Sequence, residues 1–297
     1  MERSKYSLPY ENLDLYHTLI SGQTFEWSHD YENDVWNGSI YGQPIILKQV
    51  GTSKRGFLKY EAESDLSSDI QKYFHLDENY PALITKINFG EENQEILDKL
   101  YGLRVIRQDP WLCINSFIIS QNNTVANIRN SLRKITALIQ GEEPDEHYIF
   151  PTYDQLRNLT TEELKSCKVG YRAEYLQDFY NKISINPNLV QDLEQLDYVQ
   201  AKEELMKIKG VGEKVADCIL LYAYGKYEAY PIDTHLRQAT HEIFFADSTR
   251  KPSDREVRKW ATQKWGDLAG LSHFFLFTYH RLYGSVSNNE PSIKKVK

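Results

Sequence analysis

The chain has 297 residues, of which 41% are hydrophobic, and its formal net charge is −7. This length can bury a full core and predicts two domains, or three. No apolar run approaches the roughly 20 residues of a membrane span, and the first residues lack a signal-peptide core, so we expect an intracellular protein. Cys113, Cys167 and Cys218 are widely spaced, which argues against a disulfide framework, and they cannot supply the four thiolates of an iron–sulfur cluster.

The negative total charge argues at first against a nucleic-acid partner, but the charge is unevenly distributed. Residues 61–100 are strongly acidic, whereas residues 250–265 are rich in basic side chains. These are Arg250, Lys251, Arg255, Arg258, Lys259 and Lys264, against Asp254 and Glu256. Because affinity for DNA follows the local patch rather than the total, the acidic balance weakens a DNA-binding hypothesis without excluding it.

Residues 1 to about 100 are predicted to form an antiparallel β-rich domain. Trp36–Gly42 and Pro44–Val50 alternate or run apolar between glycine turns, as strands do. Before them, Ser21–Trp27 is predicted as a glycine turn that leads into an aromatic strand. Taken alone, that segment is an ordinary turn.

Residues 101–284 are predicted to be helical, and residues 285–297 to form a flexible tail. Asp109 is placed to cap a helix that begins at Pro110. Its apolar stripe ends in the polar run Ser120–Thr124, which either caps the helix or binds a ligand. Residues 141–160 are predicted as a loop and a short helix, and Lys259–Tyr283 as an aromatic-rich last helix.

A glycine-flanked turn, Gly210–Gly212, lies between two predicted helices. The first helix closes with Leu205 and Ile208, and the second shows three- and four-residue spacing at Val215, Cys218, Ile219 and Tyr222. Glycines let the backbone turn tightly and approach a partner closely. The second helix then starts with free N–H groups that suit a phosphate. A plain helix hairpin accounts for this pattern equally well.

Three side chains near this turn suggest chemistry. Lys214 lies in the first turn of the second helix, where a cation opposes the helix dipole, and Cys218 falls on the same face. Asp233 is placed as the N-cap of a following helix from Thr234 to about Phe244. Asp233 alone is most simply a cap. Together, however, a lysine, a carboxylate and an outward-facing helix N-terminus are the parts of an amine-nucleophile site.

The run G-V-G-E-K-V-A-D-C-I, followed by P-I-D-T-H, resembles the helix-hairpin-helix glycosylases with the Gly/Pro-Asp signature. Within that superfamily the chain looks most like the 8-oxoguanine DNA glycosylases, with further matches from Ser21 to Phe277. The resemblance implies an α+β fold, in which an antiparallel β domain precedes a helical glycosylase core. It also implies a bifunctional base-excision-repair enzyme, which removes 8-oxoguanine through a lysine Schiff base and cleaves the abasic site by β-elimination.

The resemblance assigns the catalytic roles to Lys214 and Asp233. Lys214 would attack C1′ of the sugar, and Asp233 would stabilise the positive charge that builds up there. The attack requires a neutral amine, so burial and a nearby cationic field are expected to lower the pKa of Lys214.

The resemblance also implies how the damaged base is read. The S-G-Q-x-F-x-W match assigns to the Gly22 carbonyl the recognition of the base. The base would lie between Cys218 and Phe277. His273 stands where many members have a glutamine that reads the Watson–Crick edge, so this sequence departs from the family there.

The DNA-binding residues that the resemblance implies are Asn122, Asn127, Tyr171, Arg172, Gly210, Gly212 and His235. Asn122 would occupy the void left by the extruded nucleotide. From the G-Y-R-A match, Tyr171 would wedge into the base stack and Arg172 would contact the orphaned base. Asn127 stands where the family has a second arginine for that base. The hairpin glycines and the helix end near His235 would hold phosphates.

No cofactor is expected to be required, although the hairpin carbonyls of Met206, Ile208 and Val211 would bind a structural monovalent cation or calcium. The expected partner is double-stranded DNA containing 8-oxoguanine, and no membrane partner is expected. The protein is expected to be a monomer that lies in the cytoplasm or nucleoid, or in the nucleus of a eukaryote. One alternative is a glycosylase for another damaged base, such as an alkylated purine. The other is a non-catalytic helix-hairpin-helix DNA-binding protein, against which Lys214 and Asp233 argue because phosphate binding needs neither.

Overall fold

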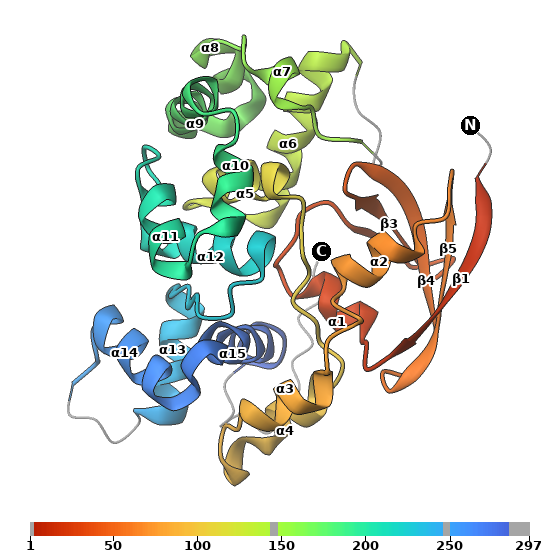
Figure 1. Cartoon of the computed structure of the whole chain (residues 1–297), viewed down its shortest axis with the longest axis vertical. Coiled ribbons are helices and arrows are strands. Elements are labelled where there is room, and N and C mark those ends of the chain that lie inside the picture. The colour runs from red at the N-terminus through yellow and green to blue at the C-terminus, as the bar shows by residue number, and fades with distance from the viewer. Residues whose placement is uncertain (1–2, 143–147, 246–249, 285–297) are drawn as a thin grey trace.

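The computed structural model describes residues 3–142, 148–245 and 250–284. A five-stranded antiparallel sheet forms one side of the molecule, and most of the helices lie on the other side (Figure 1). This arrangement confirms the expected fold class, an N-terminal β domain followed by a helical core. None of the helices in the described ranges combines the length and apolarity that crossing a bilayer requires.

The sheet has the strand order β1-β5-β4-β3-β2. Its strands are β1 (Ser4–Glu11), β2 (Ser28–Asp30), β3 (Val35–Ile40), β4 (Gln43–Gly51) and β5 (Arg55–Ala62). Side chains alternate along β5, so that Leu58, Tyr60 and Ala62 are buried on one face. The two strands predicted around residues 36–50 are confirmed as β3 and β4. The strand predicted within Ser21–Trp27 is wrong, because those residues form bends before β2.

The prediction of strands up to about residue 100 is wrong beyond β5, where the chain is helical. The helices beyond β5 are α2 (Ser67–Tyr73), α3 (Tyr80–Lys86) and α4 (Gln94–Lys99), with a 3-10 turn at Glu91–Asn93, and a further helix, α1 (Leu15–Ile20), lies between β1 and β2. Local signals explain α3, since the side chain of Asn79 accepts a hydrogen bond from the N–H of Ala82 and Pro81 lies in the first turn.

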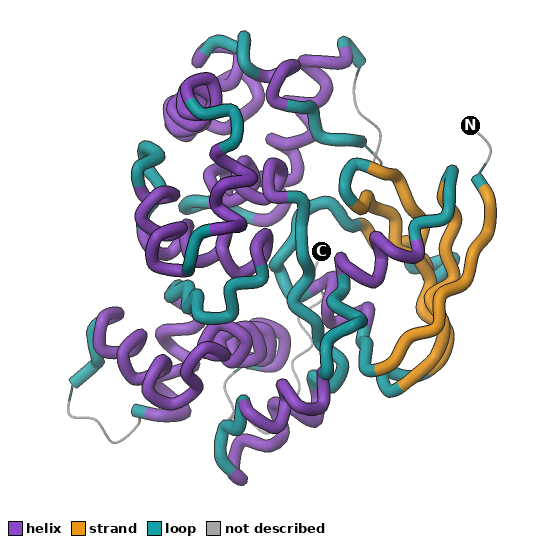
Figure 2. The backbone as a smooth tube through the Cα atoms, viewed as in Figure 1, coloured by secondary structure: helices purple, strands orange, loops and turns teal. Residues whose placement is uncertain are grey.

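The rest of the described chain is helical, as predicted (Figure 2). Its helices are α5 (Pro110–Ser120), α6 (Val125–Gln140), α7 (Tyr153–Leu156), α8 (Thr161–Leu164), α9 (Ala173–Ile185), α10 (Leu189–Gln195), α11 (Tyr198–Met206), α12 (Glu213–Tyr224), α13 (Thr234–Phe244), α14 (Asp254–Trp265) and α15 (Ala269–Tyr283). Short helical turns, Lys165–Val169 and Gly170–Arg172, connect α8 to α9. The prediction of a single last helix over Lys259–Tyr283 is wrong. The helix is interrupted between α14 and α15 at Gly266, whose φ is +55°. The predicted tail, residues 285–297, lies outside the described ranges.

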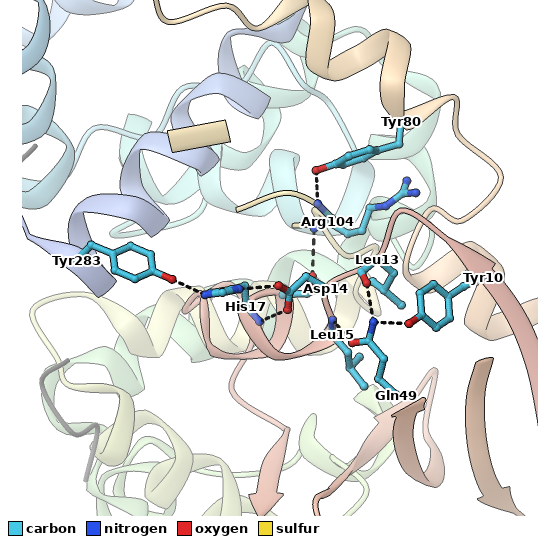
Figure 3. A network of polar contacts seen from close by, with 11 residues as sticks. Tyr10, Leu13, Asp14, Leu15, His17, Gln49, Tyr80, Arg104 and Tyr283 are labelled. Atoms are coloured by element: carbon cyan, nitrogen blue, oxygen red, sulfur yellow. Dashed lines mark hydrogen bonds and ion pairs between the residues drawn. The ribbon is translucent and has the colours of Figure 1, made fainter. Parts of the chain in front are cut away.

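Buried side chains form two clusters, which meet along the segment that joins the sheet to the helices. Leu47, Trp27 and Phe74 belong to the cluster beneath the sheet, whereas Ile87 of the α3–α4 region packs with the helical core. The side chain of Asp14, the N-cap of α1, accepts a hydrogen bond from the backbone N–H of His17. The backbone N–H of Asp14 donates to the carbonyl of Gly102 in the joining segment (Figure 3). Helix α1 is thereby tied to the connection between the two clusters.

Gln23 ties the Ser21–Trp27 segment to the connection as well. Its buried side-chain amide donates to the carbonyls of Thr18 and Arg104, at 2.9 Å each. Its side-chain oxygen accepts from the N–H of Ile106 at 2.8 Å, and its own carbonyl accepts from Gln108 at 2.7 Å. Since a buried amide with all its groups paired is costly to move, this segment is held rigidly beside the helical core.

A carboxyl group is buried three residues further on. Glu26 accepts a hydrogen bond of 2.7 Å from the hydroxyl of Ser39. Burial raises the pKa of Glu26 from 4.5 to about 8, against the lowering effect of Ser39, and the charge of Asp109 raises it further. The carboxyl is therefore protonated in the folded protein at neutral pH.

We expect Glu26 to make stability depend on pH. When folding raises the pKa of a carboxyl group, the contribution of that group to the free energy of unfolding is fully present below its pKa in the unfolded state. That contribution is lost as the pH rises through its pKa in the folded state. Wild type and Glu26→Gln should be equally stable near pH 4.5. At pH 8.5 the variant should be more stable, by roughly 3–5 kcal/mol as an upper bound.

Urea unfolding at several pH values measures this difference. Replacement of the exposed Glu63 by glutamine is the matched control, which should give no such pH-dependent gap. A gap that does not change with pH would mean that Glu26 is ionised in the folded protein.

Candidate active site

The glycine turn of the hairpin rests on helix α9. Gly210 has a φ of +79°, and a Cβ atom there would lie 2.3 Å from the ring of Tyr175. The N–H of Lys209 donates to the carboxylate of Asp178 at 2.7 Å, and its ammonium pairs with Glu174 at 2.7 Å. Only glycine fits this conformation and this contact, so the turn has a fixed position relative to α9.

The hairpin confirms the two predicted helices, which are α11 and α12. Gly212 is the N-cap of α12 and has no side chain to accept from the first-turn N–H groups. A Cβ atom at Gly212 would meet nothing within 4 Å. The N–H groups therefore face an open approach, as a phosphate-binding helix N-terminus requires.

Lys214 lies in the first turn of α12, with its ammonium 5.8 Å from the centre of the Phe117 ring. The sulfur of Cys218 does most to raise the pKa of Lys214 and Asp233 adds to this effect, while burial acts in the opposite direction. Burial raises the pKa of the Cys218 thiol itself to about 11. The Lys214 ammonium in turn lowers the pKa of this thiol, so the two groups are electrostatically coupled.

The expected lowering of the Lys214 pKa is therefore wrong. That expectation assumed a cationic neighbourhood, whereas the groups that act most strongly on the ammonium are a sulfur and a carboxylate. Together these two groups outweigh the desolvation that burial imposes, because negative charge nearby favours the ammonium form. With its pKa raised, Lys214 is an ammonium group at neutral pH and would have to lose a proton before it could act as a nucleophile.

This pKa predicts how the excision rate depends on pH. Below the pKa of an amine, its neutral fraction grows about tenfold per pH unit. We expect the single-turnover excision rate at saturating enzyme to rise with pH between about 6 and 9. A rate that falls or stays level over this interval would show that deprotonation of Lys214 does not limit the reaction.

Asp233 is the N-cap of α13, as predicted, and its side chain accepts from the N–H of Leu236 at 2.8 Å. One carboxylate oxygen is engaged in this cap. The carboxylate also acts electrostatically on Lys214 and on His273 of α15. Capping and charge stabilisation are thus compatible in one side chain.

A cavity of about 830 Å³ lies beside Lys214. Its lining residues are Lys202, Glu213, Lys214, Ile232, Ser253, Asp254, Arg255 and Arg258. Four of these side chains are basic, from α11, α12 and α14, although the chain as a whole is acidic. Basic side chains around such a cavity suit the binding of a phosphate backbone.

The basic segment 250–265 is partly engaged in ion pairs within the protein. Arg258 pairs with Glu213 at 2.5 Å and lies 3.5 Å from the buried Asp217. Lys202 and Tyr198 contact the same carboxylate, at 2.9 and 2.8 Å. This cluster attaches α11 and α14 to the start of α12, so Arg258 has a structural role that the sequence did not indicate.

Gly22 lies in a bend that the helical core contacts directly. Its φ is +94°, a conformation that favours glycine. Phe25, from the same segment, packs edge-on against Phe117 of α5 at 5.6 Å, and Phe117 also stacks on Tyr222 of α12. Phe117 therefore links the Gly22 segment to Lys214, a role that its place in a buried stripe did not reveal.

The remaining base-reading candidates lie on α12 and α15. His273 stacks beside Phe277, with ring centres 5.9 Å apart and an angle of 8° between the rings, and Cys218 is buried on α12. Burial lowers the pKa of His273 to about 4, although Asp233 and the Pro231 backbone act the other way. His273 is therefore neutral at physiological pH, with one ring nitrogen able to donate and the other able to accept.

The residues assigned to the orphaned base also lie close together. Asn122, at a φ of +48°, and Asn127 are exposed near the facing ends of α5 and α6, and the half-exposed Tyr171 packs edge-on against Tyr175. Tyr175 thus contacts both the wedge tyrosine and Gly210. In the sequence, Tyr175 is only the last residue of the run G-Y-R-A-E-Y, which gives no sign of these two contacts.

Arg172 is buried, and its guanidinium group is engaged by backbone. It donates to the carbonyls of Gln121 at 2.7 Å, Asn122 at 2.8 Å and Val169 at 3.2 Å. Arg172 therefore holds the loop that carries Asn122. His235 lies in the first turn of α13, and its side chain is outside the described part of the structure.

Comparison with known proteins matches both halves of the chain to repair enzymes. The family described as "8-oxoguanine DNA glycosylase, N-terminal domain" matches residues 5–114, and "HhH-GPD superfamily base excision DNA repair protein" matches residues 115–266. An Arabidopsis thaliana N-glycosylase/DNA lyase is 27% identical over an alignment of 286 positions that covers 91% of this chain and 78% of that protein.

Two further relatives agree with this assignment. A probable N-glycosylase/DNA lyase of Methanothermobacter thermautotrophicus is 30% identical over 76% of this chain and 75% of its own. The Clostridium acetobutylicum 8-oxoguanine glycosylase/lyase, solved with double-stranded DNA containing cytosine opposite 8-oxoguanine, is 28% identical with a TM-score of 0.81, over 91% of this chain and 92% of that one. This chain therefore belongs to the helix-hairpin-helix superfamily of base excision DNA repair proteins, among its 8-oxoguanine DNA glycosylases.

Proposed function

We propose that Lys214 and Asp233 carry out the reaction of this enzyme. The protein is a bifunctional DNA glycosylase and DNA lyase that acts on 8-oxoguanine in duplex DNA. The observation that carries the residue assignment is the electrostatic coupling of the Lys214 ammonium to Cys218 and Asp233. A lysine beside a carboxylate, next to a basic cavity, suits a Schiff-base reaction on DNA and is more than phosphate binding requires.

The target base has to leave the duplex before the site can reach it, at a cost of a few kcal/mol. Tyr171, half-exposed and supported by Tyr175, would enter the base stack. Asn122 would face the orphaned base. The N–H groups at the start of α12 and the basic lining of the cavity would hold the flanking phosphates.

In the first chemical step the neutral amine of Lys214 attacks C1′, and the glycosidic bond breaks with its electron pair leaving on the base. Asp233 stabilises the positive charge that develops on the sugar. The C1′–O4′ bond then opens, and a Schiff base forms between Lys214 and C1′. Loss of a proton from C2′ expels the 3′ phosphate by β-elimination, which breaks the strand.

Recognition of the lesion rests on one proton. 8-Oxoguanine carries N7–H where guanine has a lone pair. The Gly22 carbonyl would therefore accept a hydrogen bond from the N7–H of 8-oxoguanine and repel the N7 lone pair of guanine. A buried mismatch of this kind costs on the order of 1–3 kcal/mol. The base would be enclosed by Cys218 and Phe277, with neutral His273 at its Watson–Crick edge.

A cation at the hairpin is part of the proposal, without a role in the chemical steps. The N–H of Val211 donates to the Ile208 carbonyl, which has a second lone pair, and the N–H of Ile208 donates to Leu205 rather than to Met206. The carbonyls of Met206, Ile208 and Val211 are therefore suitable oxygen ligands for a monovalent cation or calcium. Such an ion would offset the negative phosphate near the turn. Because the substrate is cellular DNA, we also propose that the enzyme acts inside the cell.

Release of the free base tests the function directly. We expect 8-oxoguanine to be released from a duplex that contains it, with strand cleavage following, and undamaged duplex to remain intact. Duplexes with an alkylated purine test the alternative reading on the same enzyme. Release of the alkylated base in preference to 8-oxoguanine, without strand cleavage, would overturn the proposal.

The substitution at position 127 predicts a weak preference for cytosine opposite the lesion. An arginine is donor-only and suits the acceptors of cytosine, whereas the amide of Asn127 is shorter and can donate or accept. The guanidinium of Arg172 donates to backbone carbonyls, so while those hydrogen bonds persist it does not replace the missing arginine contact to cytosine. Losing one charged contact should remove roughly 1–3 kcal/mol of discrimination.

Single-turnover excision opposite each of the four bases measures this preference. Asn127→Arg should strengthen the preference for cytosine, and Asn127→Ala should change it little. A strong cytosine preference in wild type that survives Asn127→Ala would show that Asn122 and Arg172 are sufficient.

A further inference from the structure

The base-reading residues proposed above come from distant parts of the chain, and one side chain connects α15 to the Gly22 bend. His273, Phe277 and Arg281 are spaced four residues apart, so they lie on one face of α15. The first two are the recognition residues described above. Arg281 continues the same face toward the N-terminal domain.

Arg281 contacts the Gly22 bend. Its Nη1 donates to the carbonyl of Ile20 at 2.8 Å. A Cβ atom at Gly22 would lie 2.3 Å from that same nitrogen, so the guanidinium lies directly against the glycine. Gly22 is therefore held from both sides, by Arg281 through Ile20 and by the joining segment through Gln23.

A second contact supports the first. The hydroxyl of Tyr283, two residues beyond Arg281, lies 2.7 Å from Nε2 of His17 in α1 (Figure 3). The other ring nitrogen of His17 lies 2.7 Å from the carboxylate of Asp14. The end of α15 thus holds both α1 and the bend that follows it.

We propose that Arg281 is a positioning residue for lesion recognition, which holds the Gly22 carbonyl at the fixed distance from His273 and Phe277 that an extruded 8-oxoguanine requires. A carbonyl that discriminates through one proton does so only if its direction is fixed, because hydrogen bonds weaken steeply away from linear geometry. Burial lowers the pKa of Arg281 from its usual value, while Tyr222 and Asp233 act in the opposite direction. The inference rests on the proposed role of Gly22.

The contact changes how a substitution at Gly22 is interpreted. Gly22→Ala would place a methyl group against the guanidinium and strain a φ of +94°, so it would disturb the fold and recognition together. Replacement of Arg281 separates the two effects. Arg281→Met keeps the length of the side chain and removes the donor to Ile20.

Two substrates distinguish base reading from chemistry. Excision of 8-oxoguanine needs the base pocket, whereas cleavage at a preformed abasic site needs Lys214 but no base. We expect Arg281→Met to slow single-turnover excision at least tenfold and to leave abasic-site cleavage within twofold of wild type. Arg281→Lys, which retains one donor, should recover at least a third of the excision rate.

Arg157→Met serves as the matched control, because Arg157 is exposed at the C-terminal end of α7 and pairs only loosely with Asp154, at 3.8 Å. It should match wild type on both substrates. If Arg281→Met melts below the assay temperature, Arg281→Gln takes its place with the same criteria.

Equal loss on both substrates, or unchanged excision by a folded variant, would overturn the inference. Failure of the wild type to excise 8-oxoguanine would instead overturn the proposed function.

Discussion

Lys214→Gln should abolish both excision of 8-oxoguanine and cleavage at abasic sites, while binding to lesion-containing DNA stays within a few-fold of wild type. Glutamine approximates the length of the lysine side chain but has no amine to form a Schiff base. Because Lys214 is half-buried beside Phe117 and coupled to Cys218 and Asp233, we expect its main contribution to be chemical. The expected loss of single-turnover rate is at least about 10³-fold, a large part of what covalent catalysis supplies.

Lys207→Gln is the matched control, since Lys207 is an exposed lysine of the same hairpin and pairs with Glu204 at 2.5 Å. It should retain wild-type rates. Gel-shift titration and single-turnover assays on the same duplex separate binding from chemistry. If Lys214→Gln still cleaves, or loses binding in proportion to activity, then Lys214 is a phosphate contact and the mechanism is wrong.

Asp233→Asn should slow excision about 10²–10³-fold without unfolding the protein. Asparagine caps a helix as well as aspartate does, so the bond from the N–H of Leu236 should survive. What disappears is the negative charge near the sugar, and the loss of one electrostatic stabiliser of a transition state costs about 3–4 kcal/mol. Removal of that charge should also lower the pKa of Lys214, because Asp233 helps to raise it.

Asp197→Asn makes the same substitution at the N-cap of α11, where the side chain accepts from the N–H of Gln200 at 2.8 Å. Both variants should melt within a few degrees of wild type, and Asp197→Asn should keep its activity. Unchanged excision by Asp233→Asn would reduce Asp233 to a helix cap.

Features that depend on a few neighbouring residues were predictable from the sequence. The hairpin, the cap at Asp233 and the start of α5 at Asp109 each follow from residue types within one turn of the backbone. The helices after β5 were missed because acidic residues obscured weak local signals. The break at Gly266 was missed although a glycine marked it, because the apolar pattern resumes at once.

Features that depend on contacts between distant segments were not predictable. The pKa of Lys214 is set by a sulfur one turn away and by a carboxylate on another helix, and only the fold shows that they outweigh burial. In the same way, the sequence did not show that the Arg172 guanidinium donates to the backbone carbonyls of Gln121 and Asn122. Arg281 carried no sequence signal beyond its spacing from His273 and Phe277.

The central claim, that Lys214 forms the covalent bond to the sugar, is tested most directly by borohydride reduction during the reaction with an 8-oxoguanine duplex. Peptide mass spectrometry of the trapped complex identifies the modified residue. We predict a stable adduct on Lys214 in the wild type and none in Lys214→Gln. Release of 8-oxoguanine without any trapped adduct, or an adduct on another lysine, would contradict it.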